Sequence, residues 1–140
     1  MNISRYLRLA PLSAFVLAVA FSFWFGCDDT ITSDELDDME IPDTNVSYQE
    51  HIQPIFNVKC SSSDCHTQAK RAGGLSLATW SDATEDPFVV NPGEPGTSKL
   101  VWSIKGIGGA EPMPPPPYPT LTREQIDGVE QWILEGARDN

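Results

Sequence analysis

The chain has 140 residues and a formal net charge of −11, from 9 Lys and Arg against 20 Asp and Glu. This length predicts one domain, two at most, and 40% hydrophobic residues suffice for a modest core, which excludes wholesale disorder. The acid excess excludes DNA and RNA binding, because gripping phosphates needs a basic face. Three cysteines are too few for a disulfide scaffold, whereas 12 prolines and 10 glycines predict a loop-rich body.

Residues 1–26 have the pattern of an export signal. Two arginines precede an almost wholly apolar stretch, residues 9–25, which ends at Gly26 and Cys27. A small residue followed by Cys resembles the lipobox of bacterial lipoproteins. The resemblance implies cleavage before Cys27, lipidation of its thiol and anchoring to a membrane. An uncut membrane anchor and simple secretion are the alternatives.

The next segment, residues 27–45, carries eight acidic residues and no base. Such a stretch repels itself and stays solvated, so we expect a disordered acidic tether. It would serve as a spacer between a lipid anchor and a domain over residues 46–140. The alternative is an acidic terminus with no specific role.

A helix is predicted to open this domain. Ser47 and Glu50 fit a capping box. Pro54 removes one amide donor, so we expect the helix to kink or restart there and to continue to about Lys59. Its apolar face is formed at helical spacing by Tyr48, Ile52, Ile55 and Phe56.

The most informative residues follow directly, as Cys60, four intervening residues, Cys65 and His66. Covalent haem needs two thiols for its two vinyl groups and an imidazole beneath the iron. An adjacent Cys-His pair meets the second need, and the usual spacing is C-x-x-C-H. Here the loop is two residues longer, and it can bring Cys60 to its vinyl group by bulging outwards.

Three alternatives to haem attachment compete at this motif. Cys60 and Cys65 suit a disulfide in an exported protein. With His66 they supply three zinc ligands, but a clear fourth ligand is missing, because the other histidine is His51 and Cys27 is expected to carry the lipid. Redox-active dithiol chemistry prefers C-x-x-C at a helix start.

Further along, Thr97 is a candidate cap for a short helix over residues 98–105. Met113 then stands in a proline-rich segment, residues 111–119, that stiffens the backbone. A thioether opposite a histidine is a known haem ligation that raises the reduction potential. The alternatives are that Met113 fills a gap in the core and that His51 takes the distal position.

A strong helix start closes the chain. Thr122 and Gln125 form a capping box, and Leu121 precedes it as a hydrophobic staple. Gly136 lies just past the predicted end. The predicted apolar face consists of Ile126, Val129, Trp132 and Ile133.

In order, these pieces resemble the class I monohaem cytochrome c domains of envelope lipoproteins, over roughly residues 46–137. The matching segments are Pro54-Ile55-Phe56, Cys60 with Cys65-His66, residues 73–77, residues 92–100, Met113-Pro114-Pro115 and residues 126–137. The resemblance implies an all-α, loop-rich fold of three to five helices around one haem c, with little or no sheet. It implies thioether links at Cys60 and Cys65, His66 as proximal ligand and Met113 as distal ligand.

With both axial positions filled, outer-sphere electron transfer is expected rather than an enzymatic reaction. The expected setting is the bacterial cell envelope, lipid-anchored and facing the periplasm or the exterior. An acidic surface would steer the protein to redox partners with basic docking faces.

Two other function classes remain open. One is a haem-free interaction lipoprotein with a Cys60–Cys65 disulfide, and the other is a five-coordinate haem sensor or enzyme.

Overall fold

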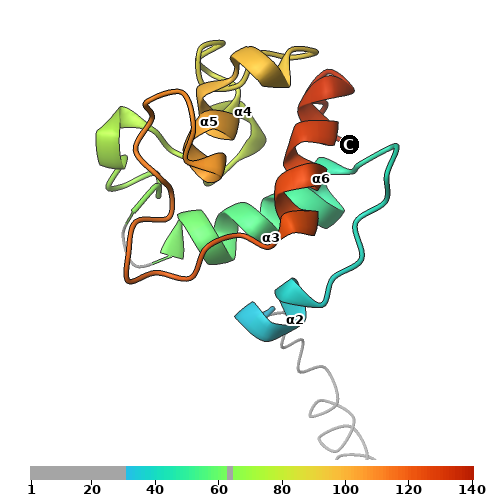
Figure 1. Cartoon of the computed structure of the whole chain (residues 1–140), viewed down its shortest axis with the longest axis horizontal. Coiled ribbons are helices and arrows are strands. Elements are labelled where there is room, and N and C mark those ends of the chain that lie inside the picture. Colours follow the sequence, from blue (N-terminus) through green and yellow to red (C-terminus); the bar gives the residue numbers. More distant parts are fainter. Residues whose placement is uncertain (1–30, 63–64) are drawn as a thin grey trace, which may run out of the picture. The chain divides into compact units, whose positions relative to one another are not determined.

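Helices joined by turns and loops build the part of the chain that the structure describes, residues 31–62 and 65–140 of a computed structural model (Figure 1). No strand occurs in these residues, which confirms the all-α expectation. None of the helices among them has the length and hydropathy of a membrane span. The expected export signal and Cys27 lie outside the described residues.

The first long helical segment runs from Tyr48 to Cys60. It joins a π-helical turn η2 (Tyr48–Ile52), a short α3 (Gln53–Ile55) and a second π-helical turn η3 (Phe56–Cys60). The Ser47 hydroxyl accepts from the Glu50 amide as predicted, but the Ser47 amide donates to Nδ1 of His51 at 3.0 Å. The reciprocal partner of this cap is therefore His51 and not Glu50.

A kink or a restart is predicted at Pro54; the helical segment continues through Pro54, and its helix type changes next to it, from η2 to α3 at Gln53. Pro54 lies at the second position of α3, directly after the π-helical turn η2. The π-helical turns on either side leave the backbone helical through it. Cys60 is thereby delivered at the end of a continuous element.

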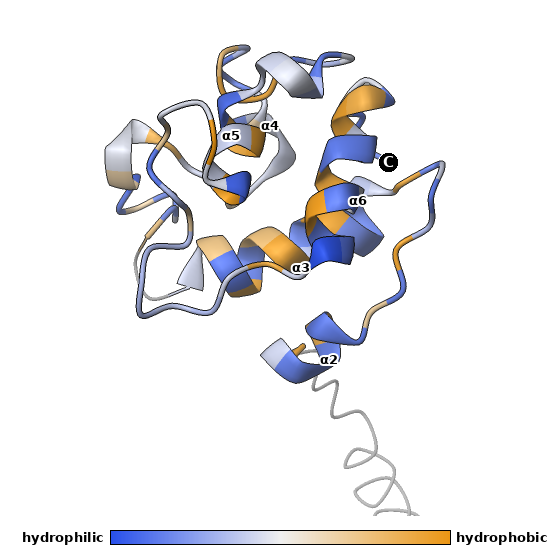
Figure 2. Cartoon of the chain, in the orientation of Figure 1, coloured by the Kyte–Doolittle hydropathy of each residue, from blue (hydrophilic) through white to orange (hydrophobic). Residues whose placement is uncertain are grey.

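An aromatic cluster joins this segment to the C-terminal helix α6 (Arg123–Leu134). The ring centroid of Trp132 lies 5.3 Å from that of Tyr48 and 6.2 Å from that of Phe56. The capping box of Thr122 and Gln125 forms as predicted, and Val129, Trp132 and Ile133 are buried. Hydrophobic residues lie along parts of both elements in Figure 2. The core thus sits where the two elements pack.

Four shorter elements lie between these two. They are η5 (Ala72–Gly74), α4 (Trp80–Ala83), η6 (Pro95–Thr97) and α5 (Lys99–Lys105). The prediction of Thr97 as the cap of α5 is wrong, because Thr97 ends η6 and Ser98 holds the N-cap position. The buried Ser98 hydroxyl accepts from the Asn91 amide and donates to the carbonyl of Glu94. It therefore holds the preceding turn instead of capping α5.

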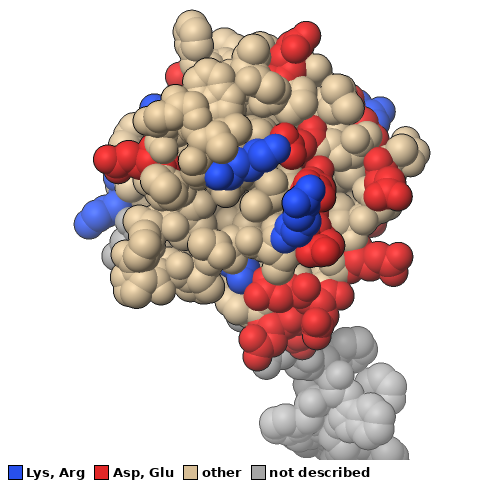
Figure 3. Space-filling view, viewed as in Figure 1, with Lys and Arg blue, Asp and Glu red and all other residues tan. Residues whose placement is uncertain are grey.

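The acidic segment from Ile31 to Asn45 belongs to the same folded unit as residues 46–140, which differs from the expected disordered tether. Thr32 caps a short helix α2 (Ser33–Asp37) through a complete capping box, and Leu36 is fully buried. Asp and Glu side chains gather over α2 in Figure 3. Because Leu36 supplies an apolar anchor, the segment docks on the domain despite its charge.

Candidate functional site

A cavity of about 310 Å³ opens among the described helices and loops. Four of the side chains singled out in the sequence line it: Cys60, Cys65, His66 and Met113. Its size falls within the range of ligand pockets, roughly 300–1,000 Å³. Much of its wall is apolar, from Leu75, Leu77, Val89, Leu100, Ile104 and Pro114. Folding therefore brings the Cys-Cys-His segment and the proline-rich segment to one apolar site.

The loop between the two cysteines is closed at its base. The His66 amide donates to the carbonyl of Cys60 at 3.1 Å, and the Ser61 hydroxyl donates to the carbonyl of His66. Residues 63 and 64 lie outside the described residues, so the expected outward bulge is not described. The closed base brings the start and the end of the longer motif together.

The imidazole of His66 has a fixed orientation. Its Nδ1 lies 3.2 Å from the carbonyl oxygen of Leu75, which can only accept, so Nδ1 carries the proton and donates. The Leu77 amide donates back to the carbonyl of His66 at 2.8 Å. The other ring nitrogen, Nε2, then keeps a lone pair for a metal, the arrangement that ligating histidines commonly show.

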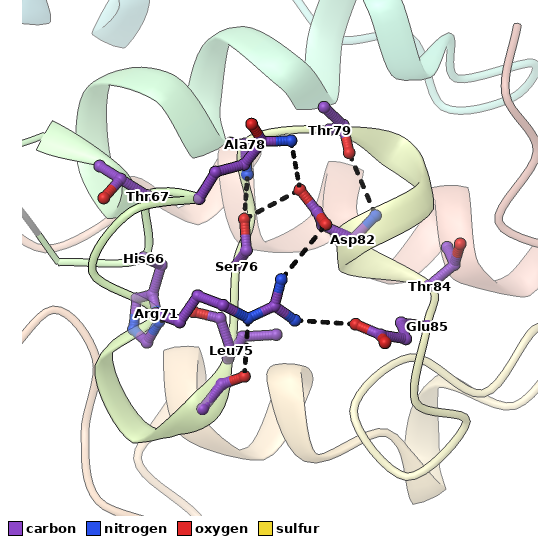
Figure 4. A network of polar contacts seen from close by, with 12 residues as sticks. His66, Thr67, Arg71, Leu75, Ser76, Ala78, Thr79, Asp82, Thr84 and Glu85 are labelled. Carbon is purple, nitrogen blue, oxygen red and sulfur yellow. Dashed lines mark hydrogen bonds and ion pairs between the residues drawn. The ribbon is translucent and has the colours of Figure 1, made fainter.

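A polar network holds the segment that carries the Leu75 carbonyl (Figure 4). The fully buried Ser76 hydroxyl donates to Asp82 at 3.0 Å, and the Asp82 amide donates to Thr79 at the start of α4. Arg71 reaches Asp82 at 3.5 Å and Glu85 at 2.8 Å. The hydrogen bond from Ser76 and that with Thr79 lower the pKa of Asp82, so it is ionised at neutral pH. These bonds tie the segment that carries Leu75 to the start of α4, beside His66.

Met113 approaches the cavity from the segment after α5. Its amide donates to the carbonyl of Ser103 at 2.9 Å, which ties the proline-rich segment to the last turn of α5. Leu100, Ser103 and Ile104 of the same helix line the cavity together with Met113. The thioether is thus held at the cavity by both its backbone and its prolines.

The state of Cys60 bears on the alternatives to haem attachment. Burial, with a smaller contribution from Cys65, raises the pKa of the Cys60 thiol to about 12. A raised pKa leaves little reactive thiolate at Cys60 near neutral pH, which disfavours redox-dithiol chemistry at this thiol. Cys60 is a free thiol, and in the described part of the chain no group of three or more His, Cys, Asp or Glu side chains is placed to hold a metal ion.

The residues at the cavity fit a covalently held haem. Two thiols, an imidazole with one nitrogen left for iron and a thioether face a largely apolar space. His51, the alternative distal ligand, does not line the cavity, and its Nδ1 accepts from Ser47. Met39 packs against the core instead.

The sequence patterns did not predict three groups that contribute to the site. These are the carbonyls of Leu75 and Ser103 and the side chain of Lys59. Backbone carbonyls leave no residue signature. Lys59 had one, since it follows Ile52, Ile55 and Phe56 at helical spacing and so falls on their apolar face. A charged residue on that face indicates either a buried ion pair or a cavity wall.

A protein-family model described as Planctomycete cytochrome C matches residues 63–117. The matched stretch includes Cys65, His66 and Met113, and it supports a cytochrome c-like domain. Comparisons with curated proteins and with solved structures find no match. The family match and the cavity therefore point to the same part of the chain.

Proposed function

We propose that this protein is a single-haem c-type cytochrome that transfers one electron at a time. Cys60 and Cys65 hold the haem covalently, and His66 and Met113 ligate its iron. The observation that carries the proposal is the convergence of these four side chains on one apolar cavity, with His66 oriented by the Leu75 carbonyl. The cytochrome c family match supports it independently.

The ligand set decides between electron transfer and other haem functions. A bound haem supplies reversible one-electron chemistry, and a His/Met pair leaves no open position for oxygen or peroxide. Met113 is suited to the distal position because the Ser103 carbonyl and the adjacent prolines hold its backbone at the cavity. We therefore favour electron transfer over a five-coordinate sensor or an enzyme.

We further propose a place in the bacterial cell envelope. The export signal of residues 1–26 and lipidation at Cys27 would anchor the domain to a membrane, facing the periplasm or the exterior. The net charge of −11 favours redox partners with basic docking faces. Fractionation of the producing cells, with Cys27→Ser as a control, tests the anchor.

The intact mass under denaturing conditions tests the haem assignment. The protein is produced in cells with haem-attachment machinery, beside a control cytochrome. A mass gain of one haem that survives denaturation is expected for the wild type, and it is lost in the Cys60→Ser/Cys65→Ser double variant. An apo mass lacking two hydrogens, beside a mature control cytochrome, would instead show a Cys60–Cys65 disulfide and overturn the proposal.

A further inference from the structure

A buried cation stands at the wall of the cavity. Lys59 directly precedes Cys60 in η3, and its side chain is only 1% exposed. Among the described residues that line the cavity, the charged ones are Lys59 and Lys99, both basic. A buried ammonium needs a countercharge, because the loss of its hydration is expensive.

The countercharge comes from the acidic segment. Oδ1 of Asp37, at the end of α2, lies 2.8 Å from Nζ of Lys59. The contact with Lys59 is the largest cause that lowers the pKa of Asp37, so the carboxylate is ionised at neutral pH. The ion pair therefore links α2 to the residue that precedes the first haem-attaching cysteine.

A buried glutamine holds Asp37 in this position. Nε2 of Gln125 donates to Oδ1 of Asp37 at 2.9 Å and to the carbonyl of Leu36 at 3.2 Å. Gln125 is 1% exposed and Leu36 is fully buried. Since α6 and the core fix both residues, Asp37 meets Lys59 as a built contact and not as a chance surface pair.

We propose that Asp37 tunes the reduction potential of the site by compensating the charge of Lys59 at the cavity wall. The inference rests on the proposed function. Reduction lowers the positive charge of a bound haem by one, so a nearby negative charge opposes it and a nearby positive charge favours it. The effect is larger than at a surface, because the ion pair and the cavity are partly shielded from water. Residues 31–45 then contribute to the redox site through Asp37, in addition to joining the N-terminal part of the chain to the domain.

Asp37→Asn and Asp38→Asn make a matched pair for the test. Both remove one negative charge from adjacent, exposed positions, but Asp37 pairs with the buried Lys59, whereas no ion pair of Asp38 with Lys59 occurs among the described residues. At pH 6, Asp37→Asn is expected to favour reduction about threefold to tenfold, where a tenfold change is about 59 mV for one electron. Asp38→Asn is expected to change the reduction potential much less, because it leaves the charge of the buried Lys59 compensated by Asp37. Equal shifts in the two variants would overturn the inference.

Lys59→Met completes a double-mutant cycle with Asp37→Asn. Alone it is expected to shift the potential downwards, and combined with Asp37→Asn it should return the potential close to the wild-type value. Urea unfolding of the same four proteins gives a second readout, since Asp37→Asn should destabilise the protein less once Lys59 is replaced. A double variant that kept the potential of Asp37→Asn, or losses of stability that simply added, would overturn the inference. A protein with no covalent haem would instead refute the proposed function, so the two failures are distinct.

Discussion

Gly128 of α6 packs directly against Ile41 of the acidic segment: a Cβ at position 128 would lie 2.8 Å from Cγ2 of Ile41. Helix propensity alone favours alanine over glycine here by about 1 kcal/mol. We nevertheless expect Gly128→Ala to destabilise the protein, by about 1–3 kcal/mol, because the added methyl overpacks this contact. Urea unfolding measures the difference, and Gly128→Ala/Ile41→Ala should recover most of the loss. A stabilised single variant would mean that the segment does not pack on α6.

The aromatic cluster is expected to dominate the stability of the domain. Trp132 is 1% exposed and contacts both Tyr48 and Phe56, so Trp132→Ala should cost about 3–5 kcal/mol. Phe88, which is 80% exposed, is the control, and Phe88→Ala should change stability by no more than about 0.5 kcal/mol. Thermal unfolding of the two variants beside the wild type tests this. Similar losses for both would contradict the assignment of the core.

We expect the contribution of Glu135 to folding stability to be lost in acid. Hydrogen bonds from Gln131 and from the amides of Asn45 and Val46 lower the pKa of Glu135 below its ordinary value of 4.5. A lowered folded-state pKa stabilises the protein above the ordinary value, and this contribution is lost as the pH falls below about 4.5 through the folded-state pKa. Unfolding of Glu135→Gln against pH should therefore show a shallower decline below pH 4.5 than the wild type. Parallel curves would show that Glu135 does not contribute.

Comparing Met113 with Met39 distinguishes a role in iron ligation from a role in core packing. If haem binds as proposed, Met113→Ala should lower the reduction potential and open a position for carbon monoxide, because the proposed thioether ligand at the cavity is removed. Met39→Ala is the matched control, since Met39 packs on the core but does not line the cavity. Visible spectra with and without carbon monoxide provide the measurement. If Met113→Ala kept the wild-type spectrum and potential, another residue would be the distal ligand.

Replacing Ser76 tests whether its hydrogen bond to Asp82 stabilises the segment beside His66. Its hydroxyl is fully buried and donates to Asp82, so Ser76→Ala should destabilise the protein by about 1 kcal/mol. Thr84→Ala is a control of similar chemistry beside this network, because the Thr84 hydroxyl donates to the Trp80 carbonyl within α4 and not to Asp82. Hydrogen exchange of the Leu77 amide should increase in Ser76→Ala and not in Thr84→Ala. An unchanged exchange rate would show that Ser76 does not hold this segment.

Local patterns in the sequence predicted the elements that depend on near neighbours. The capping box of Thr122 and Gln125 formed as expected, because both partners lie within one helical turn. Cys60, Cys65 and His66 are also near neighbours, so their spacing indicated a haem-attachment motif, whereas Met113 reaches the same cavity only through the fold. The absence of alternating strand patterns likewise predicted the all-α fold of the described chain.

Contacts between distant segments were decided by the tertiary structure alone. Charge composition predicted a solvated tether for residues 27–45, but one apolar side chain, Leu36, and the space left by Gly128 dock the part from Ile31 onwards. The Leu75 carbonyl that orients His66 and the Asp37 carboxylate that meets Lys59 depend on how loops and helices pack. Sequence spacing determines which residues share a helix face or a turn, whereas the pairing of remote groups follows from burial summed over the whole core.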